Sequence, residues 1–193
     1  AVEDGERIAI YGDYDVDGVT SVSILYLFLS QRGADVGYYI PSRIREGYGV
    51  STSAGDVLAE RGVKLIITVD TGITAIDEVE HARMRGIDVV ITDHHECHTE
   101  LPDACAVVNP HRADCPYPFK GLAGVGVALK LVMALGGKAR YRELFQEYAD
   151  LAAVGTVADV MLLQGENRVF VDRGLQSLRH TKRPGIAALM RES

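Results

Sequence analysis

The chain has 193 residues, 47% of them hydrophobic, and a mean hydropathy of +0.05. These values fit one globular domain with a sizeable core and exclude a disordered chain. The longest apolar runs are far shorter than the roughly 20 residues that cross a bilayer, and no signal-peptide pattern opens the chain. We therefore expect a cytoplasmic protein without a membrane partner.

The net charge of −7 is unusual for a protein that handles nucleic acid, whose affinity usually comes from basic surface. Six aspartates that the patterns below assign to one site supply all but one of these charges. They are Asp13, Asp15, Asp17, Asp70, Asp93 and Asp159. Two bound divalent cations would neutralise most of this cluster, so the acidity does not exclude an anionic substrate.

Three cysteines are present, and no pair has the CxxC spacing of a metal site. Free thiols in a reducing compartment are the expected state. Cys97 and His98 could offer ligands to zinc, but no second closely spaced pair completes a set of four, so zinc is not predicted.

Short β-branched runs alternate with helical patterns in the first half of the chain. The expected strands are Arg7 to Tyr11, Val36 to Ile40, Lys64 to Val69, Ile87 to Thr92 and Cys105 to Val108. Between them, Thr20 to Gln31, Thr52 to Arg61 and Ala75 to Arg85 are expected helices, each followed by a glycine. Most of the strands are apolar almost throughout, as in strands covered on both faces. The alternation predicts a mainly parallel five-stranded sheet flanked by helices.

Helices dominate the second half, after a turn-rich stretch from Asn109 to Lys120. They are expected at Val125 to Leu135, Tyr141 to Val157 and Asn167 to Leu178, with further breaks at Asn167 and Thr181 to Pro184. No linker or repeat divides the chain. The prediction is therefore a single α/β domain, residues 1–193, with a helical C-terminal portion.

Three of the expected strands run directly into an aspartate, at Asp13, Asp70 and Asp93. Ligand sites of open parallel sheets lie beyond the carboxyl ends of the strands, so these side chains would converge if their strands are neighbours. A single aspartate in this place is usually a helix cap. Three carboxylates that repel one another in a partly dehydrated site indicate a bound cation.

The first of these loops reads Gly-Asp-Tyr-Asp-Val-Asp-Gly from Gly12 to Gly18. A D-x-D-x-D-G string also opens an EF-hand, but Ile24 stands where that loop needs its bidentate glutamate, and a strand precedes it. The alternative is a tight loop of carboxylates that leads into the helix expected at Thr20. The N-terminus of that helix also favours a phosphate.

Asp93 is followed by His94 and His95. Two adjacent imidazoles do not readily bind one metal, so we expect one to be a ligand and the other to face the substrate. Oxygen and imidazole ligands without thiolate suit Mn²⁺ or Mg²⁺. Arg43 is a candidate phosphate clamp, since guanidinium matches phosphate in bidentate fashion, although a solvated surface arginine is an equal alternative.

The glycine-rich stretch from Gly121 to Gly126 suggests a dinucleotide site, but it follows a proline-containing loop rather than a strand. No ribose-binding acid can be placed, so no nucleotide cofactor is predicted. Close approach of the backbone to the metal site, or helix packing, explains these glycines better.

The motifs GDYDVDG, VDTG, DHH, LAGVGVALK and GTVADV, in this order, resemble the DHH phosphoesterase superfamily. The stretches PSRIREGYGVS, NPHRADCPYPFKGLAGVG, NRVFVDRGLQSLR and RPGIAAL are similar to the RecJ family of single-strand-specific exonucleases within it, over essentially the full chain. Thr71 and Met161-Leu162-Leu163 depart from the usual pattern, and neither departure touches a ligand position.

The resemblance implies two-metal hydrolysis of phosphodiesters, with two divalent cations, Mn²⁺ or Mg²⁺, and 5′-to-3′ degradation of single-stranded DNA in repair and recombination. It implies metal ligands at Asp15, Asp17, Asp70, His94 and Asp159, with Asp70 bridging and Asp13 close by. Asp159, in an apolar helical run, would be costly there without a cation. His95 would face the scissile phosphate, or alternatively it would form a hydrogen bond that orients a metal ligand. The resemblance also implies catalytic roles for Asp93 and Arg43.

RecJ-like proteins continue into a second substrate-binding domain and a nucleic-acid-binding OB module, which this chain does not contain. It is therefore expected to be a catalytic fragment, a monomer that holds single-stranded DNA weakly. Two alternatives remain. One is a DHH enzyme for small substrates such as oligoribonucleotides or cyclic dinucleotides. The other is an inert DHH scaffold of a replication complex, which would lose ligand residues that are all present here.

Overall fold

The structure is a computed structural model that describes residues 1–44 and 46–192. Arg45, within the PSRIREGYG stretch, and Ser193, the end of the expected domain, lie outside the described residues. Five parallel strands form one sheet in the order β2-β1-β3-β4-β5. The bounds are β1 Ile8–Gly12, β2 Val36–Tyr39, β3 Leu65–Val69, β4 Asp88–Thr92 and β5 Ala106–Val108.

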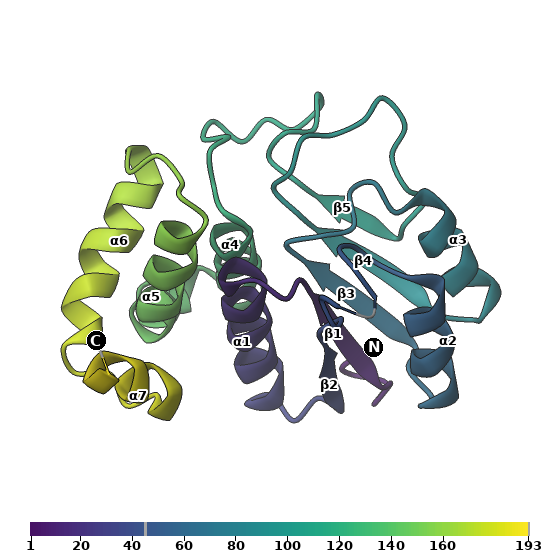
Figure 1. Cartoon of the computed structure of the whole chain (residues 1–193), viewed down its shortest axis with the longest axis horizontal. Helices are drawn as coiled ribbons and strands as arrows, with labels where there is room; N and C mark the ends of the chain where they lie inside the picture. The colour runs from purple at the N-terminus through teal and green to yellow at the C-terminus, as the bar shows by residue number, and fades with distance from the viewer. Residues whose placement is uncertain (45, 193) are drawn as a thin grey trace.

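Helices cover both faces of this sheet (Figure 1). The helices α1 Val16–Ser30, α2 Thr52–Glu60, α3 Ile76–Met84 and α4 Gly124–Gly136 are followed by the short 3-10 turn η1 Lys138–Arg140 and by α5 Tyr141–Ala158, α6 Gly165–Leu178 and α7 Pro184–Glu192. The strand β2 lies on one side of β1, and β3, β4 and β5 follow on the other side, so the switch point of the topology is between β1 and β3.

Alternation along the central strands builds two cores. Ile8 and Ile10 of β1 face α1, α4 and α5, whereas Ala9 and Tyr11 face α2 and α3. The prediction of a five-stranded parallel sheet flanked by helices, with a helical C-terminal portion, is confirmed. The strands β2 and β5 are partly exposed, because they are the two edges of the sheet and lack a neighbour on one side.

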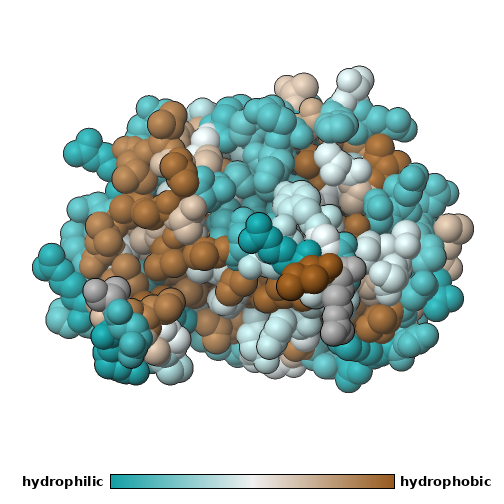
Figure 2. Space-filling model, viewed as in Figure 1, coloured by the Kyte–Doolittle hydropathy of each residue, from teal (hydrophilic) through white to brown (hydrophobic). Residues whose placement is uncertain are grey.

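The C-terminal helices form a further layer on the α1 and α4 side, with α5 against both helices and α6 against α5 (Figure 1). Figure 2 shows hydrophobic side chains gathered over this side of the molecule. Exposed hydrophobic residues there include Val157, Val160, Leu162, Leu163 and Val169. Among the residues that the structure describes, no helix has the length and apolar character needed to span a membrane.

Two local expectations were wrong. The first helix begins at Val16 rather than Thr20, because Asp15 caps it. Asn167 lies inside α6 instead of breaking it, and its amide donates to the carbonyl oxygens of Gly121 and Leu162. The break expected at Thr181 to Pro184 is confirmed, since α6 ends at Leu178 and α7 begins at Pro184. Arg183 holds this segment in place, and its Nε donates to Asp150 at 2.9 Å.

The contact between α5 and α6 depends on Gly174. A Cβ atom at this position would lie 2.2 Å from the Cβ of Ala153 and 2.3 Å from the carbonyl oxygen of Ala149. Both are parts of a packed helix and cannot swing aside. The two helices can therefore approach closely only because residue 174 has no side chain.

We expect Gly174→Ala to lower the free energy of unfolding by roughly 1–3 kcal/mol, through overpacking, when urea denaturation is measured. Gly185→Ala in α7 is the matched control, because a Cβ there meets nothing within 4 Å. Equal stability of the two variants would contradict this account of the helix contact.

Candidate metal centre

The carboxyl ends of β1, β3 and β4 carry the aspartates that the sequence places after its strands. Asp13, Asp70 and Asp93 follow these strands directly, and each is at most 3% exposed. The three strands are neighbours, so their ends open into one crevice beside the switch point. The expected convergence of the three loops is present.

Asp15 and Asp17 have different places because α1 begins between them. Asp15 is the cap of α1 and accepts a hydrogen bond from the Gly18 amide at 2.8 Å. Asp17 lies in the first turn, 1% exposed, and its carboxylate accepts from the amides of Gly124 and Val125 at 2.7 and 2.8 Å. Asp17 therefore caps α4, whose own N-terminal residue provides no side-chain cap.

Asp70 adopts a left-handed backbone conformation, with φ of 59°. Aspartate tolerates this region better than most residues, and here it directs the side chain toward α4. A Cβ at Gly124 would lie 2.6 Å from Oδ1 of Asp70. The expectation that a glycine of the LAGVGVALK motif allows close backbone approach to the site is confirmed at this position.

His94 lies at the centre of the cluster and is 8% exposed. Its Nε2 atom is 3.0 Å from Asp70 Oδ1, 3.8 Å from Asp17 Oδ2 and 3.7 Å from Asp159 Oδ2. Asp159 is the C-terminal cap of α5 rather than an interior helical residue, and this position brings it from the helical layer to the strand ends.

Three buried atoms of this cluster make no hydrogen bond with any residue the structure describes: Asp70 Oδ1, His94 Nε2 and Asp159 Oδ2. Buried polar atoms without partners are costly in a folded protein. These three converge, and two are oxygens and one an imidazole nitrogen, which is a donor set that suits a hard or borderline divalent cation. The residues present fit a metal ion.

Donor atoms within 4.8 Å of one another form three overlapping groups. The groups are Asp13, Asp15 and Asp70; Asp70, His94 and His95; and Asp17, His94 and Asp159. Asp70 belongs to two of these groups, and His94 also belongs to two. The Oδ1 atom of Asp70 lies 3.0 Å from the Nε2 atom of His94. The three groups therefore form one continuous set of donor atoms.

Burial and like charge dominate the electrostatics of the centre. Loss of hydration is the largest cause that raises the pKa of Asp17 and of Asp70, each to about 8, and neighbouring carboxylates add to it. The pKa of Asp13 and of Asp159 is raised as well, again chiefly by burial. Without a bound cation, burial and mutual repulsion disfavour the ionised form of these carboxyl groups.

Asp93 differs from the other strand-end aspartates. Its Oδ1 accepts from the amide of His94 and from Nδ1 of His95, both at 2.7 Å, while Oδ2 accepts from the amide of Ile73 at 2.9 Å. Both oxygens are occupied, and Asp93 belongs to no metal group of the described residues. The geometry makes it a positioning residue for the two histidines rather than a member of the metal-facing set.

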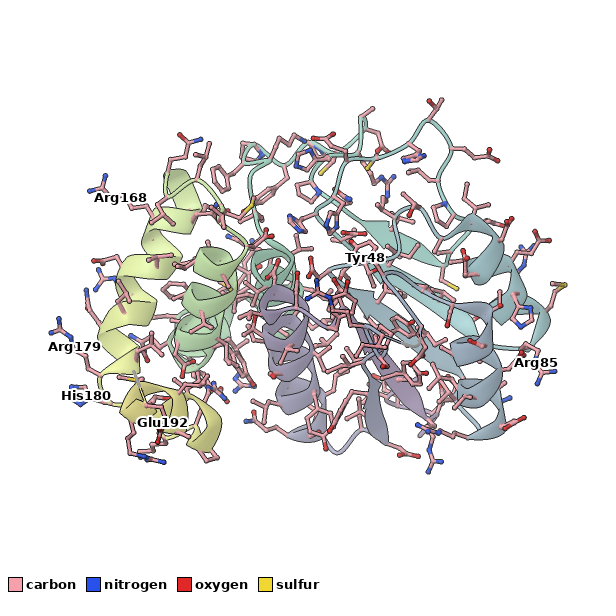
Figure 3. The ribbon with its side chains drawn as sticks, viewed as in Figure 1. Tyr48, Arg85, Arg168, Arg179, His180 and Glu192 are labelled. Carbon is pink, nitrogen blue, oxygen red and sulfur yellow. The ribbon has the colours of Figure 1, made fainter. Side chains whose placement is uncertain are left out.

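His95 is held by Asp93 on one side and meets Tyr48 on the other. The hydrogen bond to Asp93 is the largest cause that raises the pKa of His95, to about 9. The Tyr48 hydroxyl lies 3.2 Å from His95 Nε2, and the two rings meet edge to face. Figure 3 shows Tyr48 in the middle of the molecule, close to the strands.

The sequence reasoning did not single out Tyr48. It stands between Gly47 and Gly49, which have φ of 79° and 93°, so the loop turns sharply on both sides of the ring. In the sequence, only the Gly-Tyr-Gly string could have pointed to Tyr48, as a residue held in a sharply turned loop. Arg43, the expected phosphate clamp, is exposed and stacks 5.4 Å from the centre of the Tyr14 ring, outside the groups of donor atoms.

Comparison with known proteins gives a consistent result. The sequence pattern described as the DHH family, N-terminal domain, matches residues 7–156. The single-stranded-DNA-specific exonuclease RecJ of Bacillus subtilis (strain 168) is 51% identical over 193 residues, which are all of this chain and 24% of that protein. The RecJ of Escherichia coli (strain K12) is 43% identical over 98% of this chain and 35% of its own length.

Solved structures agree. A crystal structure of exonuclease RecJ bound to manganese superposes with a TM-score of 0.88 at 39% identity and covers all of this chain and 49% of that one. The chain therefore spans about a quarter of the B. subtilis relative and about half of the solved one.

The raised pKa values predict how stability responds to pH when a chelator is present. Unfolded aspartate titrates near 3.9, whereas Asp17 and Asp70 titrate near 8 in the folded chain. Between these values the folded state binds more protons, so its stability falls as pH rises from about 4 to about 8. In EDTA, the Tm should decline over this interval, and added Mn²⁺ should raise Tm most at the alkaline end.

Differential scanning calorimetry of the chain and of Asp70→Asn checks this. The variant removes one of the two titrating groups, so its decline should be shallower. A Tm in EDTA that is constant between these pH limits, or that rises, would show that the two carboxyls are not protonated as described.

Proposed function

This chain belongs to the DHH family, and on that premise we propose that it hydrolyses phosphodiester bonds with two divalent cations, Mn²⁺ or Mg²⁺. We further propose single-stranded DNA as the substrate and 5′-to-3′ exonuclease action, as in the RecJ relatives that carry this name. The observation that carries the proposal is the convergence of Asp70 Oδ1, His94 Nε2 and Asp159 Oδ2 without hydrogen-bond partners.

In this proposal the first cation is held by Asp13, Asp15 and Asp70, and the second by Asp17, Asp70, His94 and Asp159. When bound, such cations supply a more acidic water molecule and neutralise charge on the phosphate. The positions of these side chains are fixed by the fold, since Asp15 and Asp17 accept hydrogen bonds from the backbone amides of Gly18 and Gly124 at two helix N-termini.

His95 is the residue proposed to meet the scissile phosphate. Asp93 fixes the ring through Nδ1, and Nε2 on the other side of the ring lies 3.2 Å from the Tyr48 hydroxyl. From that position it can donate a hydrogen bond to a phosphoryl oxygen as charge develops there. Arg43, exposed on the neighbouring loop, is proposed to reach the next phosphate.

An inert scaffold is disfavoured by the completeness of the donor set. A chain that no longer bound metal would gain stability by replacing buried, mutually repelling carboxylates, yet Asp17 and Asp70 are both retained at 1% and 2% exposure. We also propose that the chain is one catalytic domain that works as a monomer in the cytoplasm. Its three free cysteines are compatible with a reducing compartment.

Asp70→Ala should reduce hydrolysis of 5′-labelled single-stranded DNA in Mn²⁺ by at least about a thousandfold, because it removes the carboxylate shared by two donor groups. Asp70→Asn is the matched variant, since asparagine tolerates the left-handed backbone and isolates the loss of charge. Circular dichroism should show that both variants fold. Full activity of either variant would contradict the shared role of Asp70.

A comparison of turnover on a long single strand with turnover on a dinucleotide separates the exonuclease from a small-substrate enzyme. We expect faster cleavage of the long strand. Preference for the dinucleotide would favour the small-substrate alternative, while leaving the metal-dependent chemistry in place.

A further inference from the structure

A second concave surface lies between α5 and α6, away from the metal centre. Its volume is about 450 Å³, and it is lined by Arg142, Phe145, Gln146, Ala149, Arg173, Gln176 and Ser177. We call it the α5–α6 groove. The lining residues from Arg142 to Ala149 belong to α5 and those from Arg173 to Ser177 belong to α6, so the two helices supply the two walls.

The lining is rich in hydrogen-bond donors and contains no carboxylate, although the chain has 27 acidic residues. Arg142 stands on one wall and Arg173 on the other, and both are exposed. Two acids flank these arginines in the sequence. Glu143 pairs with Arg140 at 2.5 Å. Asp172 forms a long, exposed ion pair with Arg173, with its Oδ2 atom 3.8 Å from Nε, and such exposed pairs are weak.

A cavity larger than the α5–α6 groove provides a contrast. It measures about 600 Å³, lies beside β5 and α4, and has two cations in its wall. Each is already neutralised, since Arg112 pairs with Asp114 and Lys130 pairs with Glu166, both at 2.7 Å. Only the α5–α6 groove combines two opposed guanidinium groups with a lining free of acids among these two cavities.

Charge along the sequence supports an anionic ligand. Residues 164–193 contain six basic and three acidic residues, whereas the chain as a whole carries −7. The basic excess therefore lies in the segment that contains α6 and α7, opposite in sign to the metal-facing cluster, whereas α5 has one basic and three acidic residues. Such asymmetry is typical of a surface that attracts a polyanion.

We propose that the α5–α6 groove is an exosite for the phosphodiester backbone of a nucleic-acid strand. This inference rests on the proposed nuclease function for its choice of polyanion. Guanidinium groups match phosphate oxygens in bidentate fashion, and the carboxamides of Gln146 and Gln176 add neutral donors. No base-reading group is needed, so the contact is independent of sequence.

The position of the groove defines which substrates can use it. The α5 residues that line it, from Arg142 to Ala149, precede Asp159 by 10 to 17 residues, and this corresponds to roughly 15–25 Å along a helix. A dinucleotide at the metal centre cannot reach that far. A longer strand can occupy both surfaces, and the groove then contributes to affinity without taking part in the chemistry.

The test compares the double variants Arg142→Ala/Arg173→Ala and Arg168→Ala/Arg179→Ala. The second pair removes the same charge from exposed positions outside the groove, and Figure 3 shows Arg168 and Arg179 projecting away from the body of the molecule. Fluorescence anisotropy with labelled oligothymidine in Ca²⁺, over a series of salt concentrations, measures binding without relying on cleavage.

We expect the groove variant to weaken binding of the long strand about tenfold at low salt. The slope of log Kd against log salt concentration should fall by about 1.4, the value for two phosphate contacts on a single strand. The control pair should change both quantities much less. Turnover of a dinucleotide in Mn²⁺ should be the same in all three proteins.

Equal losses in the two double variants would reveal a diffuse charge effect and overturn the exosite, as would no loss in either. Displacement of the DNA by polyaspartate at equal charge concentration would instead assign the groove to acidic protein segments and overturn it too. If binding depends on Arg142 and Arg173 but no cleavage is seen, the exosite stands and the nuclease proposal fails.

Discussion

The structure depends on one carboxylate, that of Asp17. It accepts hydrogen bonds from two backbone amides at the start of α4, and one of its oxygens also lies 3.8 Å from His94. The same group therefore satisfies a buried helix terminus and faces the candidate metal position. Because the helix amides hold it on one side, its remaining lone pairs are directed into the crevice. The fold and the candidate metal centre both depend on this carboxylate, so a substitution of Asp17 would affect both.

The close packing around Asp17 follows from that arrangement. Gly124 and Gly155 have no room for a Cβ, which would lie 2.6 Å from Asp70 and 2.9 Å from Asp17. The helices α4 and α5 thus approach the carboxylates with bare backbone, and the carboxylates of Asp17 and Asp70 are buried. Buried acidic groups favour a multivalent cation over a diffuse cloud of salt ions, because their field is less screened.

Most of the fold and the members of the site could be predicted from sequence. Strands such as Leu65–Val69 are apolar throughout and end at an aspartate, so both their burial and the position of their ends are encoded locally. What could not be predicted depends on contacts distant in sequence. Asp17 accepts a hydrogen bond from the start of α4, and the oxygens of Asp93 accept hydrogen bonds from His95 and Ile73. These partners can be identified only when the spatial neighbours of each oxygen are known. Tyr48 was missed because a tyrosine between two glycines in a loop indicates only a turn. Its role becomes visible when the structure places its hydroxyl beside His95.

The contact between Asp17 and the start of α4 joins residues that are 107 and 108 positions apart. Together with the parallel strand pairings, it gives the chain many contacts of long sequence separation, which slow folding. The last member of the cluster, Asp159, is made after more than four fifths of the chain. During synthesis, the crevice therefore cannot close until Asp159 has left the ribosome, and the acidic loops must remain solvated until then.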